Sequence, residues 1–164
     1  MPINIVLVEP EIPQNTGNIV RTCAATGAKL HLVGPLGFSI EDKYLKRAGL
    51  DYWGEAEVKY YNSFEELKGK YPEANFYYST TKALHKYCDV SYHSEDFVVF
   101  GKETAGLPEE LLRENKENCI RIPMREGIRS LNLSNSVAIV AYEALRQNGF
   151  ENLKTEGKLV KYDW

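Results

Sequence analysis

INIVLVEPEIPQNTGNIVRTCAATGAKLHLV, residues 3–33, contains the pattern that decides the fold. Residues 3–8 are almost entirely apolar, as in a strand that is buried on both of its faces. Residues 16–26 repeat apolar side chains at helical spacing and precede Gly27, a residue type that often ends a helix. Residues 29–33 are a second apolar run. The order strand, helix, strand predicts two parallel strands connected by a helix.

The same alternation continues along the chain. Three further apolar runs predict strands near residues 75–79, 96–100 and 119–122. Ser39 and Ser63 are each followed by an acid three residues later, which resembles a capping box, and the first of these helices is expected to end near Gly49. We therefore predict an α/β fold, a mostly parallel sheet flanked by helices, in a single domain over residues 1–164.

The last predicted helix covers residues 135–147, and its apolar surface is broader than packing on one sheet face requires. Either a buried homodimer contact or a deeply covered core helix explains this breadth. The charged segment that follows, residues 151–164, is expected to be a loose tail.

Composition excludes several classes of protein. The 164 residues contain no run of eighteen apolar residues, and the N-terminus lacks the basic flank and cleavage site of a signal peptide. We therefore expect a cytoplasmic protein with no membrane partner. The three cysteines, Cys23, Cys88 and Cys119, are widely separated and form no ligand set with histidine, so neither disulfides nor a bound metal are expected.

The formal charge of −3 lacks the basic excess of a non-specific nucleic-acid binder, so an RNA site must be a local patch. One candidate patch is Lys43, Lys46 and Arg47, which share one helix face at this spacing. Arg129, together with Arg121 and Arg125, belongs to a second candidate. An ordinary solvated helix face is the alternative explanation of the first patch.

The first segment with a chemical signature is EPEIPQNTGNIVRTCAATG, after the first strand, where ligands of open α/β sheets bind. Asn15 or Thr16 can cap the helix that follows. Arg21 lies about one turn into that helix, and its guanidinium suits bidentate recognition of a phosphate. An ion pair of Arg21 with Glu9 or Glu11 is the structural alternative.

The second segment is FVVFGKETAGLPEELL, residues 97–112, a predicted strand, loop and helix. Gly101 and Gly106 permit positive φ angles and expose backbone groups that can bind a planar or ribose-like ligand. A simple turn with two glycines explains the same pattern.

The third segment is CIRIPMREGIRSLNLSNSVAIVAYEAL, residues 119–145. Four small polar residues interleave with leucines before the last helix, more than capping by Ser134 or Asn135 requires. This pattern indicates polar groups that face a ligand. Ile122, Met124 and Leu133 can form an apolar slot for an aromatic ring.

Taken together, the three segments resemble a known family. Their patterns are E-P-x-I-P-x-N-T-G-N-I-x-R-x-C, F-G-x-E-x-x-G-L-P and R-I-P-M-x(5)-S-L-N-L-S-N. In this order they resemble the signature motifs of the SPOUT methyltransferases, in particular the tRNA (cytidine or uridine) 2'-O-methyltransferases that modify the wobble nucleotide. The resemblance extends from residue 3 to about residue 149.

The resemblance implies a C-terminal trefoil knot, a homodimer and a tRNA site assembled across the subunits, with Tyr142 expected at the dimer contact. It implies S-adenosylmethionine as the cofactor and S-adenosylhomocysteine as the product, without a metal. The matching cofactor positions are Ser79, Gly101, Ile122 and Ser130, with Thr80, Glu103, Gly106, Met124 and Leu133 nearby. Ser79 stands where the family usually has an apolar residue, so we expect it to bind through its backbone.

The predicted reaction is methyl transfer to the ribose 2'-hydroxyl, an in-line displacement that depends on positioning. Arg21 is the main catalytic candidate, as an orienter of the ribose and its phosphate, because a guanidinium scarcely loses its proton. The proton then leaves to phosphate or water. Asn15 and Ser134 are secondary catalytic candidates. The alternatives are a non-catalytic RNA-binding or assembly protein with the same fold, and a flavodoxin-like nucleotide or flavin binder.

Overall fold

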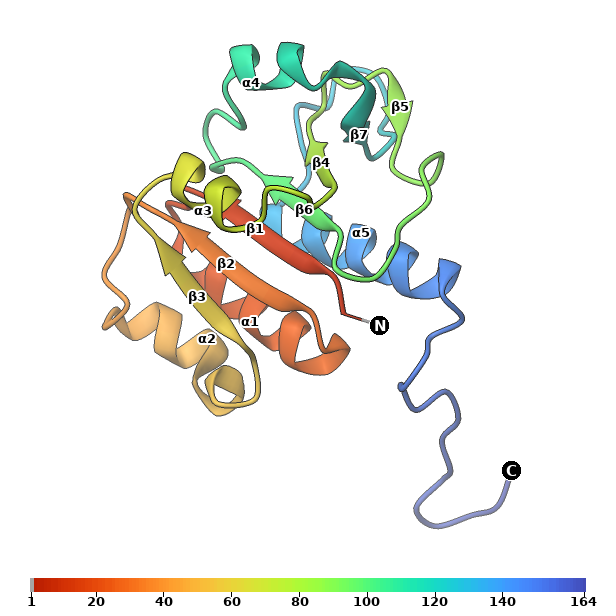
Figure 1. The fold of residues 1–164 in the computed structure, drawn as a ribbon. Helices are drawn as coiled ribbons and strands as arrows, with labels where there is room; N and C mark the ends of the chain where they lie inside the picture. Colours follow the sequence, from red (N-terminus) through yellow and green to blue (C-terminus); the bar gives the residue numbers. More distant parts are fainter. Residues whose placement is uncertain (1) are drawn as a thin grey trace.

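The computed structural model describes residues 2–164, except for the side chains of residues 49–51. Within this part of the chain, seven strands form one sheet in the order β3-β2-β1-β6-β4-β7-β5 (Figure 1). Every neighbouring pair of strands is parallel, as the alternating sequence pattern predicts. The strands are β1 (Asn4–Val8), β2 (Lys29–Val33), β3 (Val58–Tyr61), β4 (Phe76–Ser79), β5 (His85–Lys86), β6 (Phe97–Phe100) and β7 (Cys119–Arg121).

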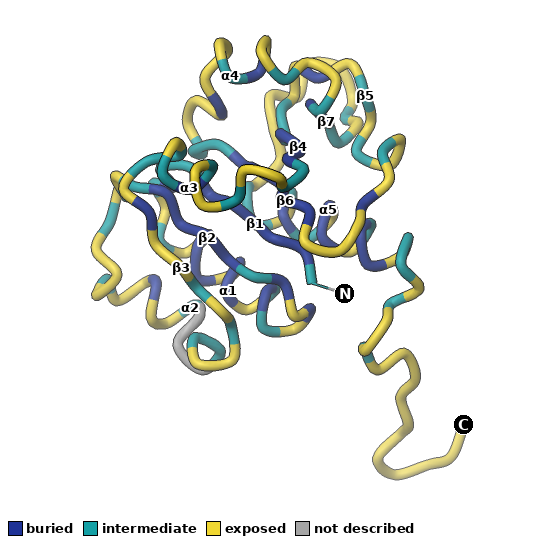
Figure 2. Tube along the Cα trace, in the orientation of Figure 1, coloured by how far each residue is buried: buried dark blue, intermediate teal, exposed yellow. Residues whose placement is uncertain are grey.

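Helices cover both faces of the sheet. They are α1 (Pro13–Thr26), α2 (Lys43–Trp53), α3 (Phe64–Lys70), α4 (Glu109–Glu114) and α5 (Leu133–Gln147), with a short 3-10 helix, η1 (Lys116–Asn118). Ile5 and Leu7 of β1 pack in one core cluster with α1 and α5, whereas Val6 packs with α3 and α4 in the other. Successive residues of a strand point to opposite faces, so this central strand is buried on both sides (Figure 2).

The start of α1 differs from the prediction and changes the geometry of the first motif. The helix begins at Pro13, and its N-cap is Ile12, which makes no capping hydrogen bond with its side chain. Proline is favoured at the first helical position because its missing N–H has no partner there. The prediction that Asn15 or Thr16 caps this helix is therefore wrong, since both lie within its first turn.

Ser63 caps α3 as predicted, because its Oγ accepts a hydrogen bond from the Glu66 N–H at 3.1 Å, while the Glu66 carboxylate accepts from the N–H of Asn62, one residue before the cap. The helix predicted from Ser39 begins later. Asp42 is its N-cap and accepts from the Tyr44 N–H at 2.8 Å, while Ser39 accepts from the Glu41 N–H. This helix, α2, also continues past the predicted end to Trp53.

Helix α5 begins two residues before the predicted start. Its N-cap is Asn132, not Ser134 or Asn135. Five apolar side chains of α5 are buried, which agrees with a covered core helix: Val137, Val140, Ala141, Ala144 and Leu145. Residues 151–164 leave the body of the domain after this helix (Figure 1).

No described helix is long and apolar enough to cross a membrane.

Candidate functional site

A cavity of about 570 Å³ lies where the carboxyl ends of neighbouring strands meet loops from distant parts of the sequence. Its walls come from the loop after β4, the loop after β6, the segment between β7 and α5, and the start of α1. Parallel strands end at the same edge of a sheet, so the loops after β4 and β6 are brought together by the topology itself. The three sequence motifs therefore contribute to one site.

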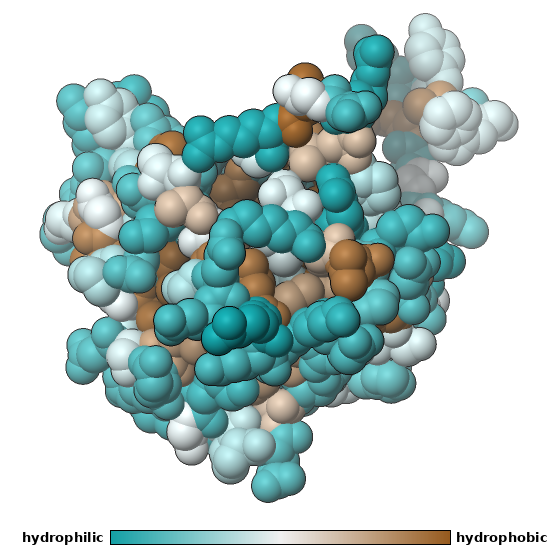
Figure 3. Space-filling model, turned by 90° about the horizontal axis from the view of Figure 1, so that it is seen from above, coloured by the Kyte–Doolittle hydropathy of each residue, from teal (hydrophilic) through white to brown (hydrophobic). Residues whose placement is uncertain are grey.

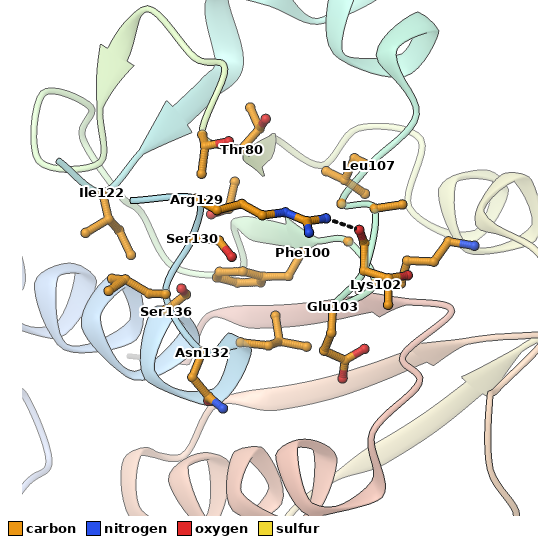
Figure 4. Close-up of a pocket in the computed structure, with 18 of the residues that line it drawn as sticks. Thr80, Phe100, Lys102, Glu103, Leu107, Ile122, Arg129, Ser130, Asn132 and Ser136 are labelled. Carbon is orange, nitrogen blue, oxygen red and sulfur yellow. Dashed lines mark hydrogen bonds between the residues drawn. The ribbon is translucent and has the colours of Figure 1, made fainter. Parts of the chain in front are cut away.

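All nine residues predicted to bind the cofactor line this cavity, together with Asn15 and Arg129. The nine are Ser79, Thr80, Gly101, Glu103, Gly106, Ile122, Met124, Ser130 and Leu133. Figure 4 shows the Phe100 ring between the Ile122 and Glu103 sides of the cavity. The lining thus combines apolar side chains with hydroxyls, two amides, a carboxylate and basic side chains.

Gly101 is required by close packing of backbone, which differs from the predicted reason of a positive φ. A Cβ atom at this position would lie 2.1 Å from the carbonyl carbon of Gly106 and 2.4 Å from the Leu107 nitrogen. Gly106 does have a positive φ of 67°, and its N–H donates to the Lys102 carbonyl at 2.9 Å. The loop after β6 therefore folds tightly onto itself and leaves its backbone close to the cavity.

The carboxylate of Glu103 joins this loop to the start of α1. Its two oxygens accept hydrogen bonds from the backbone N–H groups of Glu11 at 2.8 Å and Ile12 at 3.2 Å. Because Ile12 offers no side-chain cap, Glu103 supplies the acceptors and the negative charge that the helix N-terminus favours. This role of Glu103 is additional to the predicted cofactor contact.

A second carboxylate bridges the same two loops in the opposite direction. Glu11 accepts hydrogen bonds from the Thr104 hydroxyl at 2.7 Å and from its N–H at 3.1 Å. These bonds favour the charged carboxylate and lower the pKa of Glu11. Arg129 reaches across the cavity and donates to the Thr104 carbonyl at 2.6 Å (Figure 4). The segment before α5 is thereby attached to the same loop.

Asn15 and Asn132 complete the connection between the motifs. The Asn132 amide donates to Asn15 Oδ1 at 3.0 Å, and the Asn15 amide donates to Glu103 at 3.4 Å. Asn132 Oδ1 also accepts from the N–H and the hydroxyl of Ser134. The sequence pattern predicts a polar cluster before α5, but it does not indicate that Asn132 bridges to Asn15. A signal existed in the spacing, because Asn two residues before Ser134 is a common cap.

Arg21 does not line this cavity. Its guanidinium lies over the Tyr52 ring of α2, 4.9 Å from the ring centre. Six residues of α-helix separate it from Asn15, which amounts to about 9 Å along the axis and roughly 240° around it. Because α1 begins at Pro13, Arg21 is in the third turn and cannot reach back over the loop as predicted. No ion pair with Glu9 or Glu11 occurs among the described residues.

The predicted RNA-binding residues occupy two places. Lys43, Lys46 and Arg47 are exposed on α2 and do not line the cavity. Lys46 pairs with Glu41 at 2.8 Å, as expected for a solvated helix face. Arg129 lines the cavity, as described above. Ser134 is also outside the cavity wall, where its hydroxyl donates to Asn132.

Comparison with known proteins gives consistent matches. A family model described as the SpoU rRNA Methylase family matches residues 2–142. The tRNA (cytidine(34)-2'-O)-methyltransferase of Burkholderia ambifaria is 48% identical over 151 residues, which are 90% of this chain and 97% of that protein.

Solved structures of RNA methyltransferases also match this chain. A structure concerned with the 2-OH methylation of C/U34 on tRNA is 39% identical, with a TM-score of 0.86, and the match covers 92% of this chain and 98% of that one. The AdoMet-bound rRNA methyltransferase of Sinorhizobium meliloti is 28% identical, with a TM-score of 0.79, over 88% of this chain and 56% of that chain.

Proposed function

Because the chain belongs to the SpoU rRNA methylase family, we propose that it methylates the ribose 2'-hydroxyl of nucleotide 34, the wobble nucleotide of tRNA. The Burkholderia ambifaria relative is named for this reaction on cytidine 34. The observation that carries the proposal is the convergence of three distant sequence motifs on one cavity. The likeness to SpoU structures also implies the C-terminal trefoil knot.

The cofactor is S-adenosylmethionine, which an AdoMet-bound relative of the same fold contains. It supplies a methyl group on a sulfonium, and S-adenosylhomocysteine is the product. The cavity fits such a molecule, since its volume lies within the range of small-molecule sites and its lining combines apolar side chains with polar groups. In our proposal the backbone near Gly101 and Gly106 binds polar groups, Ile122 and Leu133 contact the adenine ring, and Ser130 donates a hydrogen bond.

In this proposal Arg21 orients the ribose and its phosphate at the cavity of a second subunit. The guanidinium is too far around α1 to serve its own cavity, so we propose that α1 of a second copy supplies Arg21 to it. The exposed apolar side chains of Ile139 and Tyr142 on α5, 36% and 46% accessible, support a contact between copies. Asn15 acts within its own subunit by holding Glu103 and Asn132 in place.

The decisive experiment is methylation of purified tRNA by the purified protein with S-adenosylmethionine, followed by mass spectrometry of the anticodon loop. We expect one 2'-O-methyl group at nucleotide 34. A parallel calorimetric titration with S-adenosylmethionine separates the enzyme from a non-catalytic RNA-binding protein of the same fold. A protein that binds no cofactor and leaves nucleotide 34 unmodified would contradict the proposal.

A further inference from the structure

A second cavity, of about 310 Å³, adjoins the cofactor cavity. Thr80 and Lys82, in the loop after β4, line both cavities, so only this loop separates them. The opposite wall comes from α4, η1 and the start of β7. A ligand in the second cavity would therefore lie next to whatever occupies the first. The volume falls at the lower end of the range for small-molecule sites.

The floor of this cavity is apolar and uncharged. Ala83, Leu112 and Cys119 are buried there, and Leu84 stands at the rim with 73% of its surface exposed. Burial raises the pKa of the Cys119 thiol, which keeps it neutral. Leu84 therefore presents most of its apolar surface to solvent beside this cavity. A flat ring can therefore pack between the floor and Leu84.

The rim is basic. Lys82, Arg113 and Lys116 line the cavity. Figure 3 views the molecule from above, the side on which Figure 1 places α4, and shows a mainly hydrophilic surface with apolar side chains between. Lys82 already pairs with Glu109 at 2.8 Å. Among the described residues, neither Arg113 nor Lys116 has a carboxylate within ion-pairing distance. Two cations thus remain available beside the cavity.

Two nearby carboxylates already have partners. Glu117 Oε2 lies 3.3 Å from His85 Nε2, and Glu109 pairs with Lys82 at the rim itself. An apolar slot beside two available cations matches a nucleotide, because the base needs a ring-sized contact and the phosphate needs positive charge. A guanidinium is well suited to the phosphate oxygens, and an ammonium adds a second charge.

We propose that this second cavity binds a nucleotide of the RNA that is adjacent to the methylated one. Its base packs between the apolar floor and Leu84, and its phosphate lies between Arg113 and Lys116. The inference rests on the proposed function: the shared wall at Thr80 and Lys82 places an occupant of the second cavity next to the cofactor, which is where the ribose that receives the methyl group must also lie. The site would hold the anticodon loop in register while the wobble ribose enters the catalytic cavity.

The test uses an anticodon stem-loop RNA as the probe, with binding measured by fluorescence anisotropy at several salt concentrations. The variant with both Arg113→Ala and Lys116→Ala is expected to bind the RNA about tenfold more weakly and with a salt slope smaller by about one. Its affinity for S-adenosylmethionine should remain unchanged. The matched control is Lys68→Ala with Lys70→Ala on α3, which removes the same charge away from both cavities.

A second variant, Leu84→Ala, tests the base contact without changing charge. It should weaken RNA binding a few-fold and leave the salt slope unchanged, and because Leu84 is 73% exposed the substitution leaves the core intact. The inference is overturned if both sets of variants bind the stem-loop like the wild type, or if free cytidine monophosphate binds as tightly as the RNA. Wild-type methylation of nucleotide 34 in the same preparations shows separately whether the proposed function stands.

Discussion

The carboxylates of Glu11 and Glu103 bridge the same two loops in opposite directions. Glu103 accepts from the Glu11 N–H at 2.8 Å, and Glu11 accepts from the hydroxyl of Thr104, the residue after Glu103, at 2.7 Å. Two like charges are tolerated here because each faces donors rather than the other carboxylate. The arrangement fixes the loop after β6 against α1, and so fixes one wall of the cofactor cavity.

Replacement of Glu103 by glutamine should disturb this wall. In Glu103→Gln an NH2 group that cannot accept replaces one of the two carboxylate oxygens, so the backbone N–H of either Glu11 or Ile12 loses its acceptor. We expect a loss of about 1–3 kcal/mol in the free energy of unfolding, measured by urea denaturation, and weaker binding of S-adenosylmethionine. Glu114→Gln, in the last turn of α4, is the matched control and should behave like the wild type. Equal stability of the two variants would show that the bridge contributes nothing.

The close packing at Gly101 gives a sharper prediction. A Cβ there would lie 2.1 Å from Gly106, so Gly101→Ala must push the two ends of the loop apart. Calorimetric titration should show cofactor affinity reduced by at least tenfold, with a lowered melting temperature. Gly69→Ala in α3 is the control, because nothing lies within 4 Å of its added Cβ. That variant should be neutral or more stable by about 0.5–1 kcal/mol.

Local patterns were sufficient to predict a mostly parallel sheet, although β3 and the two-residue β5 were missed, whereas the choice of cofactor residues came from the family resemblance. Apolar runs mark strands, and loops that follow neighbouring parallel strands must meet at one edge. Gly101, Ile122 and Ser130 therefore come together although they are far apart in the chain.

Helix boundaries, and contacts between residues that are far apart in the sequence, were not predictable in the same way. The early start of α1 at Pro13 changes the direction of Arg21, because each added residue turns a side chain by about 100°. The acceptor for the uncapped end of α1 comes from Glu103, about ninety residues later, which no local pattern indicates. The knot has no local signature, and its expectation came from the family resemblance alone.

The buried His31 predicts a pH dependence of stability. Its ring bonds to Tyr61 and Asn4, and burial lowers its pKa to about 4, below the ordinary value near 6.5. Between these two values the unfolded chain binds a proton that the native histidine does not, so stability falls as the pH falls from 6.5 to 4. Protonation of His31 in the unfolded chain thus lowers the free energy of unfolding by about 3 kcal/mol at pH 4, relative to its value above pH 6.5.

His31→Gln tests this origin, because glutamine does not titrate. Denaturation curves at pH 7, 6, 5 and 4 should show a smaller slope of stability against pH for the variant, even if it is less stable at pH 7. If stability depends on pH with the same slope in the variant and the wild type, the pH dependence comes from other groups.

Arg21 provides a test of action between subunits. Arg21→Ala should bind S-adenosylmethionine normally but lose methylation, because the guanidinium lies outside its own cavity. When this variant is coexpressed with Ile122→Trp, which fills the cavity, mixed dimers contain one intact cavity and one intact Arg21 from different subunits. Activity should return to about a quarter of the wild-type value, since half of the dimers are mixed and each has one working site. Mixed dimers without activity would place the action of Arg21 within one subunit.

Asn132 combines two functions that substitutions can separate. Its Oδ1 caps α5 through the Ser134 N–H at 2.9 Å, and its amide donates to Asn15 at 3.0 Å. Asn132→Asp keeps the cap but replaces the donor with an acceptor opposite Asn15, whereas Asn132→Ala removes both interactions.

The alanine variant should lose about 1–2 kcal/mol of stability through the cap. The aspartate variant should keep most of that stability yet bind S-adenosylmethionine more weakly, because the connection from α5 through Asn15 to Glu103 is broken. A double-mutant cycle with Asn15→Ala isolates the pair, since the aspartate substitution should then have little further effect on cofactor affinity. If instead the aspartate variant retains wild-type affinity, the three motifs are held in place by backbone packing at Gly101 and not by the amide network.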